Sequence, residues 1–222
     1  MVKSESPEGP PRKRTHAERS ASTREALIEA ARQLFSVQGY AGTPREEIVA
    51  RAGVTRGALQ HHFRDKENLF LAVYERVEEE VVEAVAGAAM QAGEDPLEQL
   101  REGCRAYLDA VLDPAIQRIC AVDGPAVLAS DVRQEITDRY ALGLVRHAVA
   151  LAVDSGELEP APVEPLARIL LAAVTAAAQY VATAPDPASA RQDAGTTVDL
   201  ILEQLRRRAS GPGSGARSVT RS

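Results

Sequence analysis

Residues 43–63 constrain this chain most strongly, because they read as two short helices joined by a tight turn. Their sequence is TPREEIVARAGVTRGALQHHF. Thr43 is expected to cap the first helix, with Pro44 at its first position and Glu46 reaching back toward the cap. Gly53 stands where this helix must end and the backbone must turn sharply.

The second helix is expected to begin after Thr55, whose hydroxyl can cap it. Its first turn presents Arg56 beside Gly57, a long hydrogen-bond donor next to a residue too small to obstruct close approach. Leu59 and Phe63 lie one turn apart and are expected to face inward. Such a pair is typical of a helix-turn-helix whose second helix enters the major groove of DNA. An ordinary helical hairpin within a bundle is the alternative that spacing alone leaves open.

The flanking residues extend this pattern over residues 23–74. The segment resembles the N-terminal domain of TetR-family transcriptional regulators, on the Ala-Ala-x-x-Leu-Phe run at 30–35, Gly39-Tyr40, residues 48–54, and Phe63 followed by Lys66 and Leu69. The resemblance implies a DNA-binding N-terminal domain followed by a helical domain that dimerises and binds a small effector.

Two positions depart from the family pattern. Gln60 stands where the family usually has Tyr, and Val49 stands where Ala is usual. Because Gln60 is expected near the DNA, the family's base preference cannot be carried over to this chain.

Charge is distributed unevenly along the sequence. The whole chain has a net charge of −6, whereas residues 11–66 hold 11 Lys and Arg against 6 Asp and Glu. A basic segment around the motif favours DNA binding there, and the acidic remainder limits nonspecific adhesion. Aromatic residues make up only 4% and Trp is absent, which favours helices packed on helices.

We therefore expect an all-α fold, with an N-terminal three-helix helix-turn-helix domain and a C-terminal helical bundle for regulation and dimerisation. The expected parts are a disordered basic arm at 1–20, the DNA-binding domain at 21–68, the ligand-binding and dimerisation domain at 88–209, and a flexible tail at 210–222. The arm's basic cluster, Arg12-Lys13-Arg14, either touches DNA phosphate or minor groove or is simply solvated.

Caps and breaks predict the individual helices. The first is expected to start at a capping box over residues 22–25 and to stop at Gly39. A fourth helix, 66–87, is expected to begin after Asp65 and to connect the two domains. Further helices are expected at 96–111, 114–129, 131–154, 163–183 and 187–209.

Nine residues are candidates for DNA contact. Arg56 suits bidentate pairing with guanine, and Gln60 suits adenine. His61 and His62 are adjacent and diverge by about 100° on a helix, so groove or phosphate contact suits them better than shared metal ligation. The complete predicted set is Tyr40, Thr43, Thr55, Arg56, Gly57, Gln60, His61, His62 and Lys66. The resemblance implies phosphate contacts for Tyr40 and Thr43, and packing is the alternative role for Tyr40.

The resemblance also implies functions for the C-terminal domain. The helices at 163–183 and 187–209 carry broad apolar faces, and in the family such a pair forms a four-helix bundle with the partner's pair. A homodimer would match a palindromic operator; burial within one subunit is the alternative. Candidate effector contacts are polar or aromatic groups in apolar surroundings, with a structural role as the alternative for each: Cys104, Tyr107, Asp123, Tyr140, His147 and Tyr180.

Other classes of function find little support in the sequence. Cys104 and Cys120 are too few and too ill-spaced for a zinc site, and we expect no metal and no cofactor. GxSxG, HExxH and phosphate-cradling glycine motifs are absent, so we expect no enzyme. No apolar run reaches the roughly 20 residues that cross a bilayer, and a cytoplasmic location is expected.

The predicted function is a TetR-like repressor that a small-molecule effector releases from a palindromic operator. A helical DNA-binding dimer without small-molecule sensing is the alternative.

Overall fold

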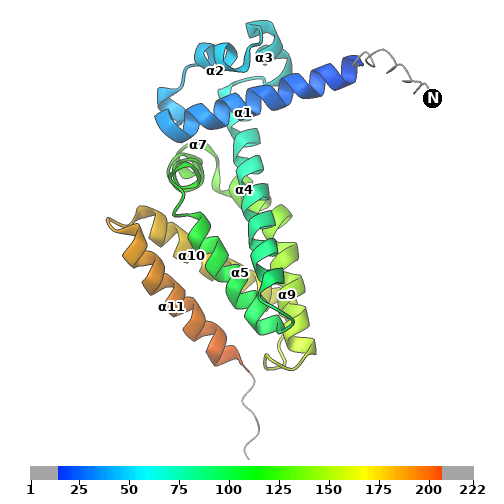
Figure 1. Ribbon diagram of the computed structural model, residues 1–222, viewed down its shortest axis with the longest axis vertical. Coiled ribbons are helices and arrows are strands. Elements are labelled where there is room, and N and C mark those ends of the chain that lie inside the picture. Colours follow the sequence, from blue (N-terminus) through cyan, green and yellow to red (C-terminus); the bar gives the residue numbers. More distant parts are fainter. Residues whose placement is uncertain (1–14, 207–222) are drawn as a thin grey trace, which may run out of the picture. The chain divides into compact units, whose positions relative to one another are not determined.

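The computed structural model describes residues 15–206, and every regular element in that range is a helix (Figure 1). An all-α fold is thus confirmed. The chain forms two compact units, the first ending at Val73 and the second beginning at Tyr74. The boundary falls within helix α4 (Lys66–Gln91), which therefore belongs to both units.

The first unit is built from α1 (His16–Gly42), α2 (Arg45–Ala52), α3 (Arg56–His62) and the start of α4. Gly39 adopts φ 74° and interrupts α1, as predicted, so that one further turn follows at a new angle. Phe35, Tyr40 and Phe70 pack edge to face or tilted, with ring centroids 5.2–5.8 Å apart. These aromatic side chains join the C-terminal part of α1 and the start of α4 in one core.

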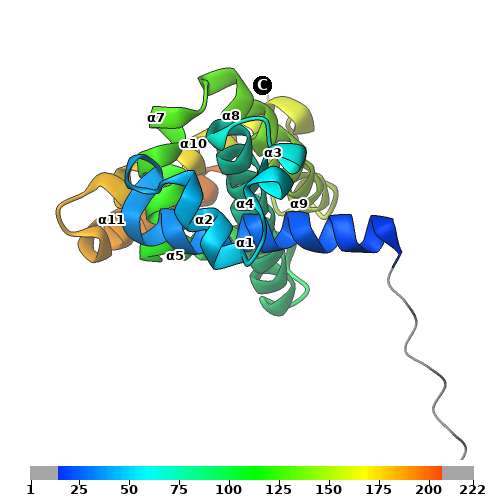
Figure 2. The same ribbon diagram turned by 90° about the horizontal axis from the view of Figure 1, so that it is seen from above.

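Helix α1 starts earlier than predicted. Thr15 is the N-cap, and it forms a reciprocal capping box with Glu18. The predicted start at residues 22–25 is wrong, and so is the predicted disorder for residues 15–20. The rest of the predicted arm, including Arg12-Lys13-Arg14, lies outside the described residues. Figures 1 and 2 both show the first turns of α1 extending beyond α2 and α3.

The turn between α2 and α3 and the cap of α3 are as predicted, whereas the N-cap of α2 is a different residue from the predicted one. Gly53 ends α2 with φ 65°, a left-handed conformation that favours glycine. Thr55 caps α3 by accepting a hydrogen bond from the backbone N–H of Ala58 at 3.2 Å. The prediction that Thr43 caps α2 is wrong: Pro44 occupies the N-cap, and the Thr43 hydroxyl donates to the carbonyl of Gly39 at 2.8 Å.

Helix α4 begins as predicted. The carboxylate of Asp65 accepts a hydrogen bond from the backbone N–H of Asn68 at 2.8 Å. This hydrogen bond, with help from Arg64, lowers the pKa of Asp65 and keeps the capping group ionised. The helix end is therefore fixed by a local interaction that the sequence pattern reveals.

The second unit contains the end of α4 and nine further helical segments. They are α5 (Pro96–Ala110), α6 (Pro114–Ile116), η1 (Gln117–Asp123), α7 (Gly124–Val127), α8 (Ser130–Thr137), η2 (Asp138–Leu142), α9 (Gly143–Asp154), α10 (Val163–Thr183) and α11 (Pro187–Leu205). Asp-Pro pairs start three of them, with Asp95, Asp113 and Asp186 as caps. The five predicted segments correspond closely to these helices. The π-helical turns η1 and η2 were not predicted.

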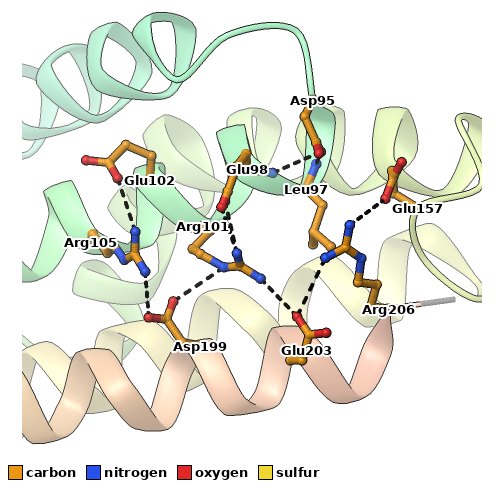
Figure 3. A network of polar contacts seen from close by, with 10 residues as sticks. All are labelled: Asp95, Leu97, Glu98, Arg101, Glu102, Arg105, Glu157, Asp199, Glu203 and Arg206. Atoms are coloured by element: carbon orange, nitrogen blue, oxygen red, sulfur yellow. Dashed lines mark hydrogen bonds and ion pairs between the residues drawn. The ribbon is translucent and has the colours of Figure 1, made fainter. Parts of the chain in front are cut away.

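Helix α5 is central to the second unit, because it packs on α9, α10 and α11. An ion-pair network adds polar contacts between α5 and α11 (Figure 3). Arg105 donates to the carboxylate of Asp199 at 2.8 Å, and Arg101 bonds both Glu98 and Glu203. These contacts fix the orientation of α11 on the face of α5.

Helices α10 and α11 have one buried and one exposed apolar face. Leu170 and Val198 lie in the core of their own subunit, whereas Ile169 and Leu200 are 65% and 61% exposed. By length and composition α10 is apolar enough to cross a membrane, but core helices of other proteins meet the same criterion. Packing within the second unit therefore explains the buried apolar face of α10 and α11 but not the exposed one.

Candidate functional site

Helix α3 presents a row of uncovered polar side chains in the first unit. Thr55, Arg56, Gln60 and His61 are all exposed, whereas Leu59, on the opposite side, is buried against the core. The Arg56 side chain is 74% exposed and reaches only Glu46, at 3.9 Å. Such an arrangement leaves these side chains available to a partner.

Gly57 adds open space to this surface. A Cβ atom built there would meet only the Thr55 hydroxyl, at 3.8 Å, among the described residues. The fold itself therefore does not require glycine at this position. A missing side chain beside Arg56 instead suits the close approach of another molecule to the backbone.

His61 and His62 differ in their surroundings. His61 is exposed and His62 is half-buried, with their rings 5.1 Å apart. Burial, followed by the nearby His61 and Arg24, lowers the pKa of His62. His62 is therefore neutral near pH 7, and a phosphate contact by this residue would use a neutral N–H group.

Tyr40, Thr43 and Lys66 form a structural cluster behind the exposed row. The ammonium group of Lys66 donates to the carbonyls of Tyr40 at 2.7 Å and Thr43 at 3.0 Å, and it lies 4.2 Å from the centre of the Tyr40 ring. Thr43 is fully buried, so a direct phosphate contact would require its hydroxyl to leave Gly39. The DNA contacts predicted for these three residues stay predictions.

The second unit holds a cavity of about 450 Å³, which is within the usual range of ligand sites. Its walls come from α4, α5, η1, α8, η2 and α10. The polar groups in the walls include Tyr74, Glu78, Tyr107, Cys120, Arg133, Thr137, Asp138, Arg168, Thr175 and Gln179. Both π-helical segments contribute to the walls, and such irregular turns are frequent at functional sites.

Glu78 is the most unusual group in these walls, because a carboxyl is buried there. The Tyr74 hydroxyl and the Cys120 thiol hydrogen-bond to it. Burial nevertheless dominates and raises the pKa of Glu78, since removing a charge from water costs more than these two bonds return. Burial also raises the pKa of Tyr74 and of Tyr107, which remain neutral phenols.

The structure places the predicted effector contacts in different surroundings. Tyr107 lines the cavity, and Cys104 lines a smaller one beside it. Asp123 is buried and paired with Arg118, whereas His147 and Tyr180 are exposed. Tyr140 is half-buried and absent from both cavity walls. Among the six, Tyr107 and Cys104 thus line these two cavities.

Tyr74 and Glu78 line the cavity from α4 and were not among the predicted site residues. Their spacing of four residues beside the apolar positions Val77 and Val81 places an acid and a phenol next to the buried face of the helix. This spacing is the signal in the sequence that indicates a buried acid.

Gly124 packs closely against the Tyr74 ring at the cavity wall. A Cβ atom at Gly124 would lie 2.8 Å from Cε2 of Tyr74 and 3.1 Å from the carbonyl oxygen of Ile119. We expect Gly124→Ala to lower the free energy of unfolding by about 1–3 kcal/mol, because the buried Tyr74 ring must move. Urea unfolding followed by circular dichroism measures this.

Gly143→Ala is the matched control. Gly143 has helical φ −60°, and an added Cβ meets no atom within 4 Å among the described residues. Alanine should leave stability unchanged or raise it by about 0.5–1 kcal/mol. Equal effects of the two substitutions would show that the contact of Gly124 with Tyr74 does not limit stability.

Together the exposed row on α3, the turn at Gly53 and a separate helical unit with a cavity define a helix-turn-helix DNA-binding protein with a second domain. Comparison with known families agrees. The family described as "Bacterial regulatory proteins, tetR family" matches residues 27–73, and "Tetracyclin repressor-like, C-terminal domain" matches residues 97–205. The chain belongs to the TetR family of DNA-binding transcriptional regulators, as the sequence predicts.

Individual relatives support this assignment. A crystal structure of a TetR-family transcriptional regulator from Pectobacterium atrosepticum is 32% identical, with a TM-score of 0.78 over 88% of this chain and 99% of that one. The regulator CymR of Pseudomonas putida is 32% identical over 57% of this chain, and AcrR of Shigella flexneri is 41% identical over 36%. The chain spans 64% and 37% of the lengths of these two curated relatives.

Proposed function

We propose that this protein is a repressor that binds a palindromic operator as a homodimer and leaves it when a small effector enters the cavity of the second unit. The observation that carries the proposal is the path of α4. The first residue of this helix, Lys66, holds the end of α1 in the DNA-binding unit, and Tyr74 and Glu78 of the same helix line the cavity.

Helix α4 contributes residues to both units, so it links the two sites covalently. A ligand that contacts Tyr74 or Glu78 favours some positions of α4 over others, and Lys66 connects any such shift to the segment from Tyr40 to Thr43. Binding of effector and of operator then weaken each other by the same factor, because coupling between two binding equilibria is reciprocal.

The exposed apolar face of α10 and α11 supports the homodimer. Ile169, Tyr180, Leu200 and Ile201 are all exposed, although apolar side chains dominate protein interiors. A second copy of the chain would cover this face by a two-fold interface, and a two-fold protein suits an inverted repeat of DNA. A mass measurement of the chain at micromolar concentration tests this step, and a monomer would contradict it.

The exposed row on α3 supports direct reading of bases. Arg56 can donate two hydrogen bonds to guanine, and Gln60 can pair with adenine. Gly57 leaves the backbone between them uncovered. Thr55, His61 and His62 flank this row and are proposed as further contacts, with His62 neutral.

Arg56→Ala should weaken binding to the operator by about 1–3 kcal/mol and relax the base preference at one position of each half-site. Fluorescence anisotropy with a set of singly substituted operators measures both effects. Arg146→Ala removes an exposed arginine from α9 of the second unit and should leave both unchanged.

An equal loss of affinity on all operator variants would assign Arg56 to phosphate rather than to a base. Its effect would then weaken with added salt and leave sequence preference intact.

The alternative function is a DNA-binding dimer that senses no small molecule. Its test is a screen for compounds that dissociate the protein from its operator and also stabilise it in the absence of DNA. The proposed function requires at least one compound with both effects. Compounds that stabilise the protein without affecting DNA binding would favour the alternative.

A further inference from the structure

Two cavities of the second unit adjoin each other at a buried acid. Besides the 450 Å³ cavity, there is a smaller one of about 80 Å³. The two share four residues of their walls: Glu78, Tyr107, Thr137 and Leu171. The side chain of Glu78 therefore stands where a ligand occupying both spaces would have to pass.

The smaller cavity has a strongly apolar character. Its walls are mainly aliphatic and come from α4, α5, α8, η2, α9 and α10, including Val82, Leu100, Ala141, Val145, Leu170 and Val174. Burying apolar surface is its main source of binding free energy, at roughly 25 cal/mol per Å². A hydrocarbon chain suits this space, and a charged group does not.

Within residues 15–206, the groups that interact with Glu78 carry no positive charge. They are Tyr74 on the same helix, Tyr107 on α5 and Cys120 on η1, and burial keeps the phenols of Tyr74 and Tyr107 neutral. Burial raises the pKa of Glu78, so the carboxyl is biased toward its neutral form.

The two arginines of the larger cavity, Arg133 and Arg168, contact groups other than Glu78. Arg168 bonds the carboxylates of Asp138 at 3.0 Å and Glu164 at 2.8 Å. Arg133 donates to the carbonyl of Leu128 at 3.4 Å. Among the contacts described for residues 15–206, neither arginine is an ion-pair partner of Glu78.

A ligand can supply the missing charge. An ammonium group beside Glu78 would ionise the carboxyl and form a charge-assisted hydrogen bond, which is about twice as strong as a neutral one. A carboxylate at the same place would lose its hydration without gaining a cationic partner, so it should bind less tightly. Thr175, whose hydroxyl is buried in the larger cavity's wall next to Tyr107, offers a further polar contact.

We propose that the effector is an organic amine with an apolar chain, bound with its ammonium group at Glu78, its chain in the smaller cavity and its remaining part in the larger one. This inference rests on the proposed function, because it assigns the chemical class of that effector. It predicts that positive charge, rather than size or apolarity alone, selects the ligand.

The test compares three compounds with one skeleton: 4-phenylbutylamine, 4-phenylbutan-1-ol and 4-phenylbutanoate. Isothermal titration calorimetry of the full chain near pH 7 should show the amine binding at least about tenfold more tightly than the alcohol, and the acid most weakly.

Variants separate Glu78 from general charge effects. Glu78→Gln keeps the size of the side chain and should abolish the preference for the amine over the alcohol. Glu83→Gln changes an exposed acid of the same helix and should retain that preference. The comparison of the three compounds on the unaltered protein needs no variant, so it holds even if Glu78→Gln is poorly folded.

Three results would overturn the amine assignment: the alcohol or the acid binding as tightly as the amine, amine binding unaffected by Glu78→Gln, or no amine binding at millimolar concentration. None of these affects DNA binding or its release by another class of compound. Conversely, an amine that binds through Glu78 but leaves operator affinity unchanged would support the site and contradict the proposed release mechanism.

Discussion

Lys66→Met should destabilise the DNA-binding unit by about 2–3 kcal/mol. The substitution keeps an apolar stem of similar length but removes the ammonium group that donates to the carbonyls of Tyr40 and Thr43. Hydrogen bonds to charged groups contribute about 1.5–3 kcal/mol, and the contact with the Tyr40 ring adds to this. Urea unfolding with hydrogen exchange over residues 27–73 measures the loss and locates it.

Arg64→Met is the control, because the Arg64 side chain is 83% exposed and pairs with the neighbouring Asp65. It should change stability by less than about 0.5 kcal/mol. If Lys66→Met instead left stability intact and lowered the salt dependence of DNA binding by about one ion, Lys66 would be a phosphate contact, which would agree with its place among the predicted DNA contacts.

Phe35→Ala should have the largest effect on folding, a loss of about 3–5 kcal/mol. Phe35 is fully buried and packs on Tyr40 and Phe70, so truncation leaves a cavity between the two ends of the first unit. We expect this unit to lose its protection from hydrogen exchange and the protein to lose DNA binding, while the second unit, which has its own core, remains folded.

Val37→Ala provides the comparison for this result. Val37 lies on the same helix but is 83% exposed, so its truncation should alter stability by less than about 0.5 kcal/mol. Similar losses for the two substitutions would mean that helix α1, rather than the aromatic cluster, determines the stability of the unit.

Local signals in the sequence predicted most of the helices. Gly53, Thr55 and Asp65 act through contacts within four residues of themselves, so their roles follow from spacing alone. Thr43 shows the limit of this reasoning. Its hydroxyl could accept a hydrogen bond from α2 or donate one to the carbonyl of Gly39. In the buried surroundings of Thr43 the bond to Gly39 is the one that forms.

The cavity could be predicted only in general terms. Its walls combine residues far apart in sequence, such as Glu78, Tyr107 and Thr175, and no periodic pattern specifies which of them meet. His147 and Tyr180 had the expected chemical character but lie at exposed positions. The π-helical segments η1 and η2 also shift the register of the following residues, which helical periodicity cannot anticipate.

The central claim is that two copies of this chain read an inverted repeat through α3. Its most direct test is to select genomic DNA fragments with the protein and, in parallel, with an Arg56→Ala/Gln60→Ala variant. We predict that the unaltered protein enriches an inverted repeat whose half-site centres lie roughly 34–36 Å apart, or a multiple of that distance, and that the variant does not. Enrichment without a repeat, or the same repeat from both proteins, would contradict the claim.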